Sequence, residues 1–136
     1  MSLLEFLGES YNPGEYGTID FKKKNKSPKP NYIHLKFFIS ISIILGFNLA
    51  YLNSSEVTIK EFLILNGSII IYLFIAYITN IVPNTKNLGW VPFVIDNPFR
   101  YSDDINRISV FILIILWPGK FISSSIINLY RYHKTT

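Results

Sequence analysis

Three long apolar stretches, residues 33–52, 62–82 and 105–130, limit the folds open to this chain. A helix rises about 1.5 Å per residue, so about 20 residues match the roughly 30 Å hydrocarbon core of a bilayer. The stretch 62–82 carries no charged residue. The sequence therefore predicts an all-α fold: a small polytopic membrane protein with two firm transmembrane helices and a third, Pro/Gly-kinked membrane segment.

The charged residues are few, and they cluster outside these stretches. They make up 16% of the chain, whereas soluble domains carry about 25%. Five lysines lie between positions 22 and 29, just before the first stretch. Basic residues that flank a span mark its cytoplasmic side and favour anionic lipids. We therefore expect an integral protein of an inner, plasma or organellar membrane, with a cytoplasmic N-terminus and lipid partners. No nucleic-acid-reading motif accompanies the lysines, so we expect no nucleic-acid partner.

The pattern predicts three parts: a polar, basic N-terminal tail (1–32), a membrane domain (33–130) with an interfacial loop (84–104), and a basic C-terminal tail (131–136). Within the first tail, Leu3, Leu4 and Leu7 fit one face of a helix. This leaves two interpretations, a loosely ordered tail or a short helix that lies on the membrane or docks on a partner. The lysine-rich and proline-rich stretch 22–30 is typical of extended or disordered chain.

The third apolar stretch is interrupted by Pro118, Gly119 and Lys120, a predicted kink with a membrane-embedded charge. A kinked crossing with Lys120 reaching toward the interface is favoured. A continuous crossing would place the lysine near the midplane, at a cost of at least about 2.5 kcal/mol. A re-entrant hairpin would expose backbone to lipid. Ser102, followed by two aspartates, predicts the start of this helix.

The sequence predicts no catalytic residue, no metal site and no cofactor, and we expect no enzymatic activity. Cysteine is absent, which excludes disulfides and thiolate sites. The two histidines, His34 and His133, lie in the flanks of the predicted spans. No phosphate-binding loop, nucleophile elbow or zinc-protease motif is present.

Small and polar residues on the first two spans indicate helix packing. Membrane helices associate through close contacts at small residues and through polar side chains. Ser42, Gly46 and Ala50 recur every four residues, and Asn48 faces Asn66 if the two spans are antiparallel. The candidate packing residues also include Gly67 and Ser68. Two interpretations remain open, packing within this chain and docking on another membrane protein.

The central loop is the candidate partner-contact loop, through Trp90, Phe93, Phe99, Arg100 and Tyr101. Its aromatic residues next to prolines favour a loop pressed against the membrane surface.

These features predict an accessory or assembly subunit of a larger membrane complex, bound to other transmembrane proteins as a hetero- or homo-oligomer. The third stretch, with its central proline and basic tail, resembles that of small three-span immunity proteins against pore-forming colicins. The resemblance covers the span pattern and Ile105–Tyr130, and it implies no residue roles. The alternative is therefore a stand-alone protein, either such an immunity factor or a small oligomeric channel.

Overall fold

The computed structural model describes residues 3–21, 31–54, 56–93, 95 and 97–135. These residues form a mostly helical fold, with four helices and one pair of strands. In chain order the elements are α1 (Leu3–Tyr11), β1 (Thr18–Asp20), α2 (Ile33–Ser54), α3 (Ile59–Ile78), β2 (Asn80–Val82) and α4 (Ser102–Thr135). By length and composition, α2, α3 and most of α4 are able to cross a membrane. These three helices suggest a membrane location.

The chain divides into two compact units, and one of the divisions along the chain lies inside α4, between Ile115 and Leu116. The first unit comprises Met1–Lys22 and Thr79–Ile115, and the second comprises Lys23–Ile78 and Leu116–Thr136. The first unit therefore holds α1, both strands, the loop that precedes α4 and the first half of that helix. The second unit holds α2, α3 and the rest of α4.

α1 turns the start of the predicted tail into a helix from Leu3 to Tyr11. This agrees with the interpretation of the three leucines as one helix face. The leucines indicated one or two helical turns, and the helix is longer than that. The predicted extended or disordered stretch, 22–30, lies outside the described residues.

The second predicted span is displaced toward the N-terminus. α3 begins at Ile59 because Thr58 and Glu61 form a capping box. The Glu61 carboxylate accepts the Thr58 N–H at 2.9 Å, and the Glu61 N–H donates to the Thr58 hydroxyl at 3.4 Å. The predicted end at residue 82 is wrong, because α3 stops at Ile78 and Asn80–Val82 form β2. Pro83 disfavours helical backbone at Val82, which is consistent with a strand there.

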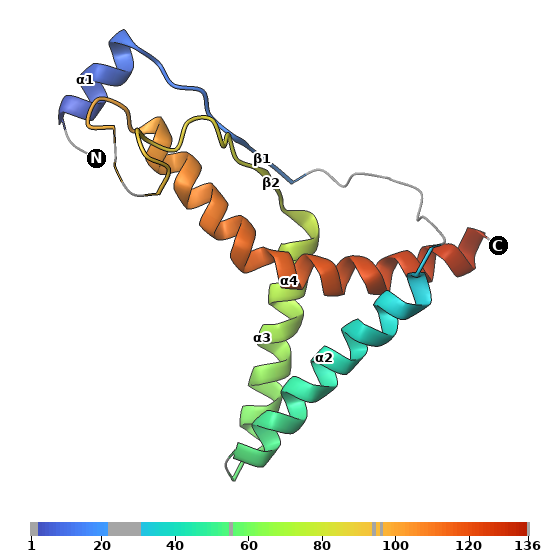
Figure 1. Ribbon diagram of the computed structural model, residues 1–136. Helices are drawn as coiled ribbons and strands as arrows, with labels where there is room; N and C mark the ends of the chain where they lie inside the picture. Colours follow the sequence, from blue (N-terminus) through green and yellow to red (C-terminus); the bar gives the residue numbers. More distant parts are fainter. Residues whose placement is uncertain (1–2, 22–30, 55, 94, 96, 136) are drawn as a thin grey trace. The chain divides into compact units, whose positions relative to one another are not determined.

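β2 pairs with β1 in an antiparallel register, with Ile19 opposite Ile81 (Figure 1). Gly17 precedes β1, and a Cβ atom there would lie 2.6 Å from the Val82 carbonyl oxygen. Glycine therefore permits the close approach of the two chain segments. The pairing joins the N-terminal region to the chain that follows α3.

α4 runs without interruption from Ser102 to Thr135, with Pro118 inside it. A re-entrant hairpin with its turn at Pro118–Lys120 is therefore wrong. The helix is longer at both ends than the predicted 105–130. The predicted kink at Pro118 stays a prediction.

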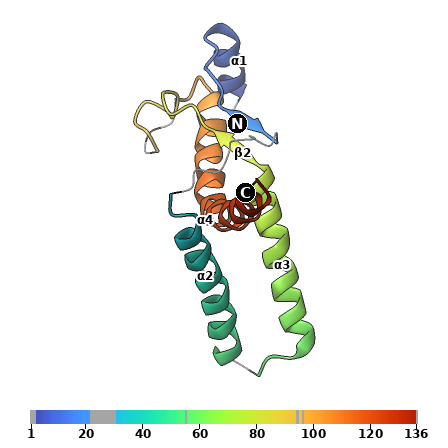
Figure 2. The ribbon, with the colours of Figure 1, turned by 90° about the vertical axis from the view of Figure 1, so that its right-hand side faces the viewer.

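In the second unit, α2 and α3 are antiparallel arms joined at one end, and the second half of α4 lies across their other ends (Figures 1 and 2). The backbone N–H of Gly119 donates to the Tyr72 hydroxyl at 3.0 Å. A Cβ at Gly119 would lie 2.8 Å from that of Ala76, so α4 meets α3 closely at this point. Farther along, the Arg131 guanidinium donates to the Tyr77 hydroxyl at 3.0 Å.

Candidate functional site: a polar core beneath the start of α4

Polar side chains fill the interior of the first unit around the first turns of α4. We call this set the polar core; its members are Glu9, Asn87, Ser102, Asp103, Asn106 and Arg107. The side chains come from α1, the loop before α4 and α4 itself. Glu9, Ser102, Asp103 and Asn106 are each at most 5% exposed. Buried polar groups are costly unless they are hydrogen-bonded, so their partners decide what this core does.

Asn106 lies at the centre of the polar core and uses its full hydrogen-bonding capacity. Its Oδ1 accepts the backbone N–H of Gly17 at 2.8 Å and that of Asn84 at 3.3 Å. Its Nδ2 donates to the carbonyl oxygens of Glu15 and Asn87, both at 3.0 Å. A side-chain amide has two donor hydrogens and one acceptor oxygen with two lone pairs, and all four are engaged. One side chain thereby ties together the segment before β1 and the segment after β2.

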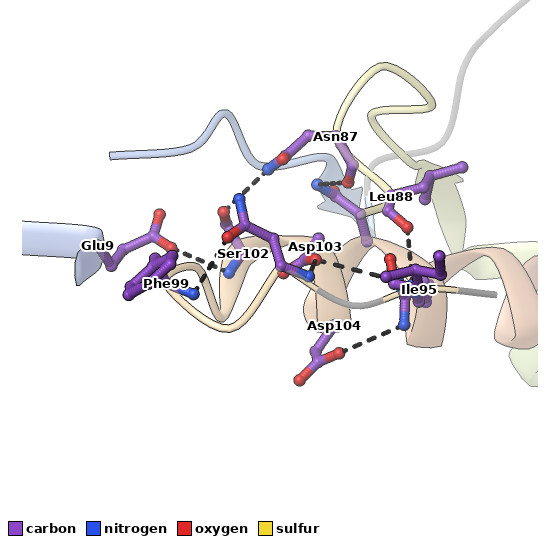
Figure 3. Close-up of polar contacts among 11 residues, drawn as sticks. Glu9, Asn87, Leu88, Ile95, Phe99, Ser102, Asp103 and Asp104 are labelled. Atoms are coloured by element: carbon purple, nitrogen blue, oxygen red, sulfur yellow. Dashed lines mark hydrogen bonds and ion pairs between the residues drawn. The ribbon is translucent and has the colours of Figure 1, made fainter. Parts of the chain in front are cut away.

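Glu9 reaches from α1 to the N-terminus of α4 (Figure 3). Its carboxylate accepts the backbone N–H of Ser102 at 3.2 Å and that of Gly14 at 2.7 Å. Burial alone raises the pKa of Glu9, but these bonds and those from the Ser102 and Tyr16 hydroxyls outweigh it, so the pKa lies below its usual value. The ionised carboxylate then satisfies an otherwise unpaired helix amide and complements the positive end of the helix.

Tyr16 and Tyr101 pack beside this carboxylate, with ring centroids 6.2 Å apart. A hydrogen bond with Tyr101, burial and the negative charge of Glu9 together raise the pKa of Tyr16. The tyrosine therefore stays neutral and acts as a hydrogen-bond donor to Glu9.

Arg107 holds the loop before α4 in place. Its Nε donates to the Leu88 carbonyl at 2.8 Å and its Nη2 to the Ile95 carbonyl at 3.2 Å. The same guanidinium lies 4.0 Å from Asp103 Oδ2 and 3.8 Å from Asp104 Oδ1 (Figure 3). Asp103 Oδ2 also accepts the Asn97 N–H at 3.1 Å. Both members of the Arg107–Asp103 ion pair therefore make hydrogen bonds to the loop.

The predicted helix start at Ser102 is confirmed, but its partners differ from a simple serine cap. The Ser102 hydroxyl accepts a hydrogen bond from the Asn87 side chain at 2.9 Å. The Ser102 N–H is satisfied by Glu9, which lies 93 positions earlier in the chain. The sequence offered no signal for this long-range pair.

The predicted packing residues belong to the second unit, whereas the polar core belongs to the first. The expected hydrogen bond between spans is present, because Asn66 Nδ2 donates to Asn48 Oδ1 at 3.0 Å. Ser42, Gly46 and Ala50 are all exposed. Outside its own helix, no described atom lies within 4 Å of a Cβ built at Gly46, so the stripe packs against no described part of the chain there.

The other helix residues divide between an internal contact and an open face. Gly67 also has open space around its Cβ position, and the Ser68 hydroxyl donates to the Ile64 carbonyl of its own helix at 2.9 Å. Gly119, next to Pro118, contacts Tyr72 of α3, and Lys120 is half-buried.

The candidate partner-contact loop divides between the surface and the interior of the first unit. Trp90, Phe93 and Phe99 are exposed, whereas Arg100 and Tyr101 are half-buried. Contact of this loop with a partner protein stays a prediction.

Sequence reasoning missed Glu9 and Asn106 as organising residues. Their positions were the one available signal: Glu9 lies near the end of an apolar helix face, and Asn106 is a polar amide at the second position of the third apolar stretch. In the part of the chain that the structure describes, no group of three or more histidine or acidic side chains is arranged to hold a metal ion. Comparison of the chain with protein-family models, curated proteins and solved structures found no match.

Proposed function

We propose that this chain is an integral membrane protein without catalytic activity, which acts through helix contacts as an accessory or assembly subunit of a membrane complex. One observation carries the proposal: the small-residue stripe of α2 is exposed and has open space at Gly46. The five lysines before α2 support a cytoplasmic N-terminus.

The physical argument concerns what drives helices together in lipid. Acyl chains are as apolar as leucine, so apolar side chains alone gain little by leaving them. Small residues permit two backbones to approach closely, and this adds van der Waals contact. Within the described part of this chain, Gly46 receives no such contact, whereas Gly119 does. A partner helix is therefore the occupant that makes use of the stripe.

The test is purification of the tagged, full-length protein from its own membranes in mild detergent, with Gly46→Ile and Leu45→Phe compared with the wild type. Both substitutions add bulk at exposed positions of α2, but they lie about 100° apart around the helix. We expect a second membrane protein at fixed stoichiometry with the wild type and Leu45→Phe, and its loss with Gly46→Ile.

Purification of the chain alone in all three samples would reject the subunit proposal. A homo-oligomer that conducts ions in planar bilayers would support the channel alternative instead. Association that appears only when a pore-forming toxin is present would support an immunity factor.

A further inference from the structure

The first unit has a polar interior and an apolar exterior. Eight of its described residues are buried, and Ile81 and Leu88 are the apolar ones among them. By contrast, Leu3 is 76% exposed, Phe6 66% and Trp90 65%. A domain folded in water shows the opposite distribution, because exposed apolar area is unfavourable there. This distribution suits an apolar solvent.

The exposed apolar residues lie on elements that contact one another. We define the apolar exterior by Leu3, Leu4 and Phe6 of α1 and by Trp90, Phe93 and Phe99 of the loop. α1 meets the loop at Gly8, where a Cβ would lie 2.8 Å from the Phe99 Cα. The loop meets α4 at Phe93, whose ring centroid is 6.1 Å from that of Phe111.

Contact with Phe111 places the loop beside a candidate membrane span. Phe111 lies nine positions after the start of α4 at Ser102, which is about 14 Å along the helix axis. On α4 itself, Ile108 and Phe111 are also exposed. The apolar exterior of the loop therefore continues onto the apolar face of a helix that is long enough to cross a bilayer.

The polar core supplies what irregular backbone needs outside water. In lipid, an unpaired backbone N–H or C=O is costly, so non-helical chain at membrane depth requires partners from the protein. Asn106 satisfies two N–H groups and two carbonyls of the flanking segments, and Arg107 satisfies the carbonyls of Leu88 and Ile95. On a loop exposed to water, water molecules would form these hydrogen bonds equally well, so side-chain partners of this kind are needed only where water is excluded.

We propose that the first unit is immersed in the headgroup and upper acyl region of the bilayer, with Leu3, Leu4, Phe6, Trp90, Phe93 and Phe99 against lipid. This proposal replaces the partner contact predicted from the sequence for Trp90, Phe93 and Phe99: the occupant of this surface is lipid and not a partner protein. Charge supports the assignment, since five lysines lie between positions 22 and 29, at and just after the end of this unit's first segment, and favour anionic headgroups. Aromatic side chains are also typical of this depth.

The first test uses native tryptophan fluorescence, because the chain has two tryptophans. The variant Trp117→Phe leaves Trp90 as the sole reporter, and Trp117 is 66% exposed, so its replacement by another aromatic residue preserves the fold. The matched control, Trp90→Phe, leaves Trp117 as a reporter inside the candidate span. Each protein is reconstituted into vesicles of phosphatidylcholine and phosphatidylglycerol, with and without bromine on the acyl chains.

We expect brominated lipid to quench Trp90 to at least half the extent seen for Trp117, and aqueous iodide to leave Trp90 nearly unquenched. Strong quenching by iodide together with weak quenching by brominated lipid would overturn the proposal.

The second test separates lipid from a protein partner. The chain contains no cysteine, so single-cysteine variants label at one defined position. Phe93→Cys is compared with Lys86→Cys, an exposed polar position of the same loop. Both are treated with a membrane-impermeant maleimide in pure lipid vesicles and in native membranes. We expect Phe93→Cys to react at least tenfold more slowly than Lys86→Cys in both. Rapid labelling of Phe93→Cys in vesicles would overturn the proposal, and slow labelling confined to native membranes would assign the surface to a partner protein.

Discussion

Replacement of Asn106 by alanine is the sharpest test of the polar core. The amide makes four hydrogen bonds to backbone groups of Gly17, Asn84, Glu15 and Asn87, and it is fully buried. Alanine removes every one of these bonds and leaves two N–H and two carbonyl groups in need of new partners. Because those groups belong to the two segments that flank β1 and β2, the strand pairing depends on this side chain.

The magnitude follows from the number of bonds. A typical intramolecular hydrogen bond contributes about 0.5–1.5 kcal/mol net, so four of them contribute about 2–6 kcal/mol. Water recruited to the freed groups offsets part of the loss, and we expect about 3 kcal/mol for the local opening of the first unit. A change of this size accelerates amide exchange through that opening by more than about 100-fold.

The assay is hydrogen exchange in detergent micelles, resolved for the backbone amides of Gly17 and Asn84. The matched control is Asn48→Ala in the second unit, where the side chain takes part in one hydrogen bond between helices. Such bonds in membrane proteins contribute about 0.6 kcal/mol on average, so the control changes exchange at Gly17 little. Unchanged exchange at Gly17 and Asn84 in the Asn106→Ala protein would refute the argument that Asn106 holds these segments together.

Two further predictions follow from single contacts. Hydrogen bonds hold the pKa of Glu9 below its ordinary value of 4.5, so the ionised carboxylate stabilises the fold fully above pH 4.5, and this stabilisation is lost as the pH falls through the lower, folded-state pKa. We therefore expect the difference in melting temperature between wild type and Glu9→Gln to shrink on acidification below pH 4.5. A difference that grows on acidification would contradict the lowered pKa. A Cβ at Gly119 would lie 2.6 Å from the Tyr72 ring, so Gly119→Ala is expected to destabilise the second unit by about 1–3 kcal/mol. The control Gly46→Ala adds its methyl group to open space and is expected to leave the melting curve of the purified protein unchanged. Thermal melting followed by circular dichroism in micelles measures both effects.

The helical arms of the second unit were predictable because their signal is local. An uninterrupted apolar run of about 20 residues has few alternatives to a membrane-spanning helix. A short connection makes two such helices antiparallel, and this geometry predicts that Asn48 lies opposite Asn66. The hydrogen bond at 3.0 Å follows from the same geometry.

The end of α3 was predicted wrongly because apolar content does not distinguish a helix from a short strand. Ile81 and Val82 follow the apolar run after only Thr79 and Asn80, with no charge between, yet they belong to β2. What decides between the two is the pairing of Ile81 with Ile19, 62 positions away. A three-residue strand has no periodicity to read, and its partner lies in a segment that composition assigned to a tail. Local patterns carry no information about such a contact.

The same reasoning explains why the first turns of α4 looked like a boundary and not a site. Ser102, Asp103, Asn106 and Arg107 are polar, and a polar cluster before an apolar run is ordinarily the edge of the membrane. In the structure these residues face the interior of the first unit, while Ile108 and Phe111 on the same helix are exposed. α4 has 34 residues, well above the roughly 20 that one crossing requires. Its first turns are therefore not needed for the crossing and are free to organise a polar core. Mean hydropathy along the sequence averages over the polar, buried face and the apolar, exposed face of these turns, so it does not reveal the core.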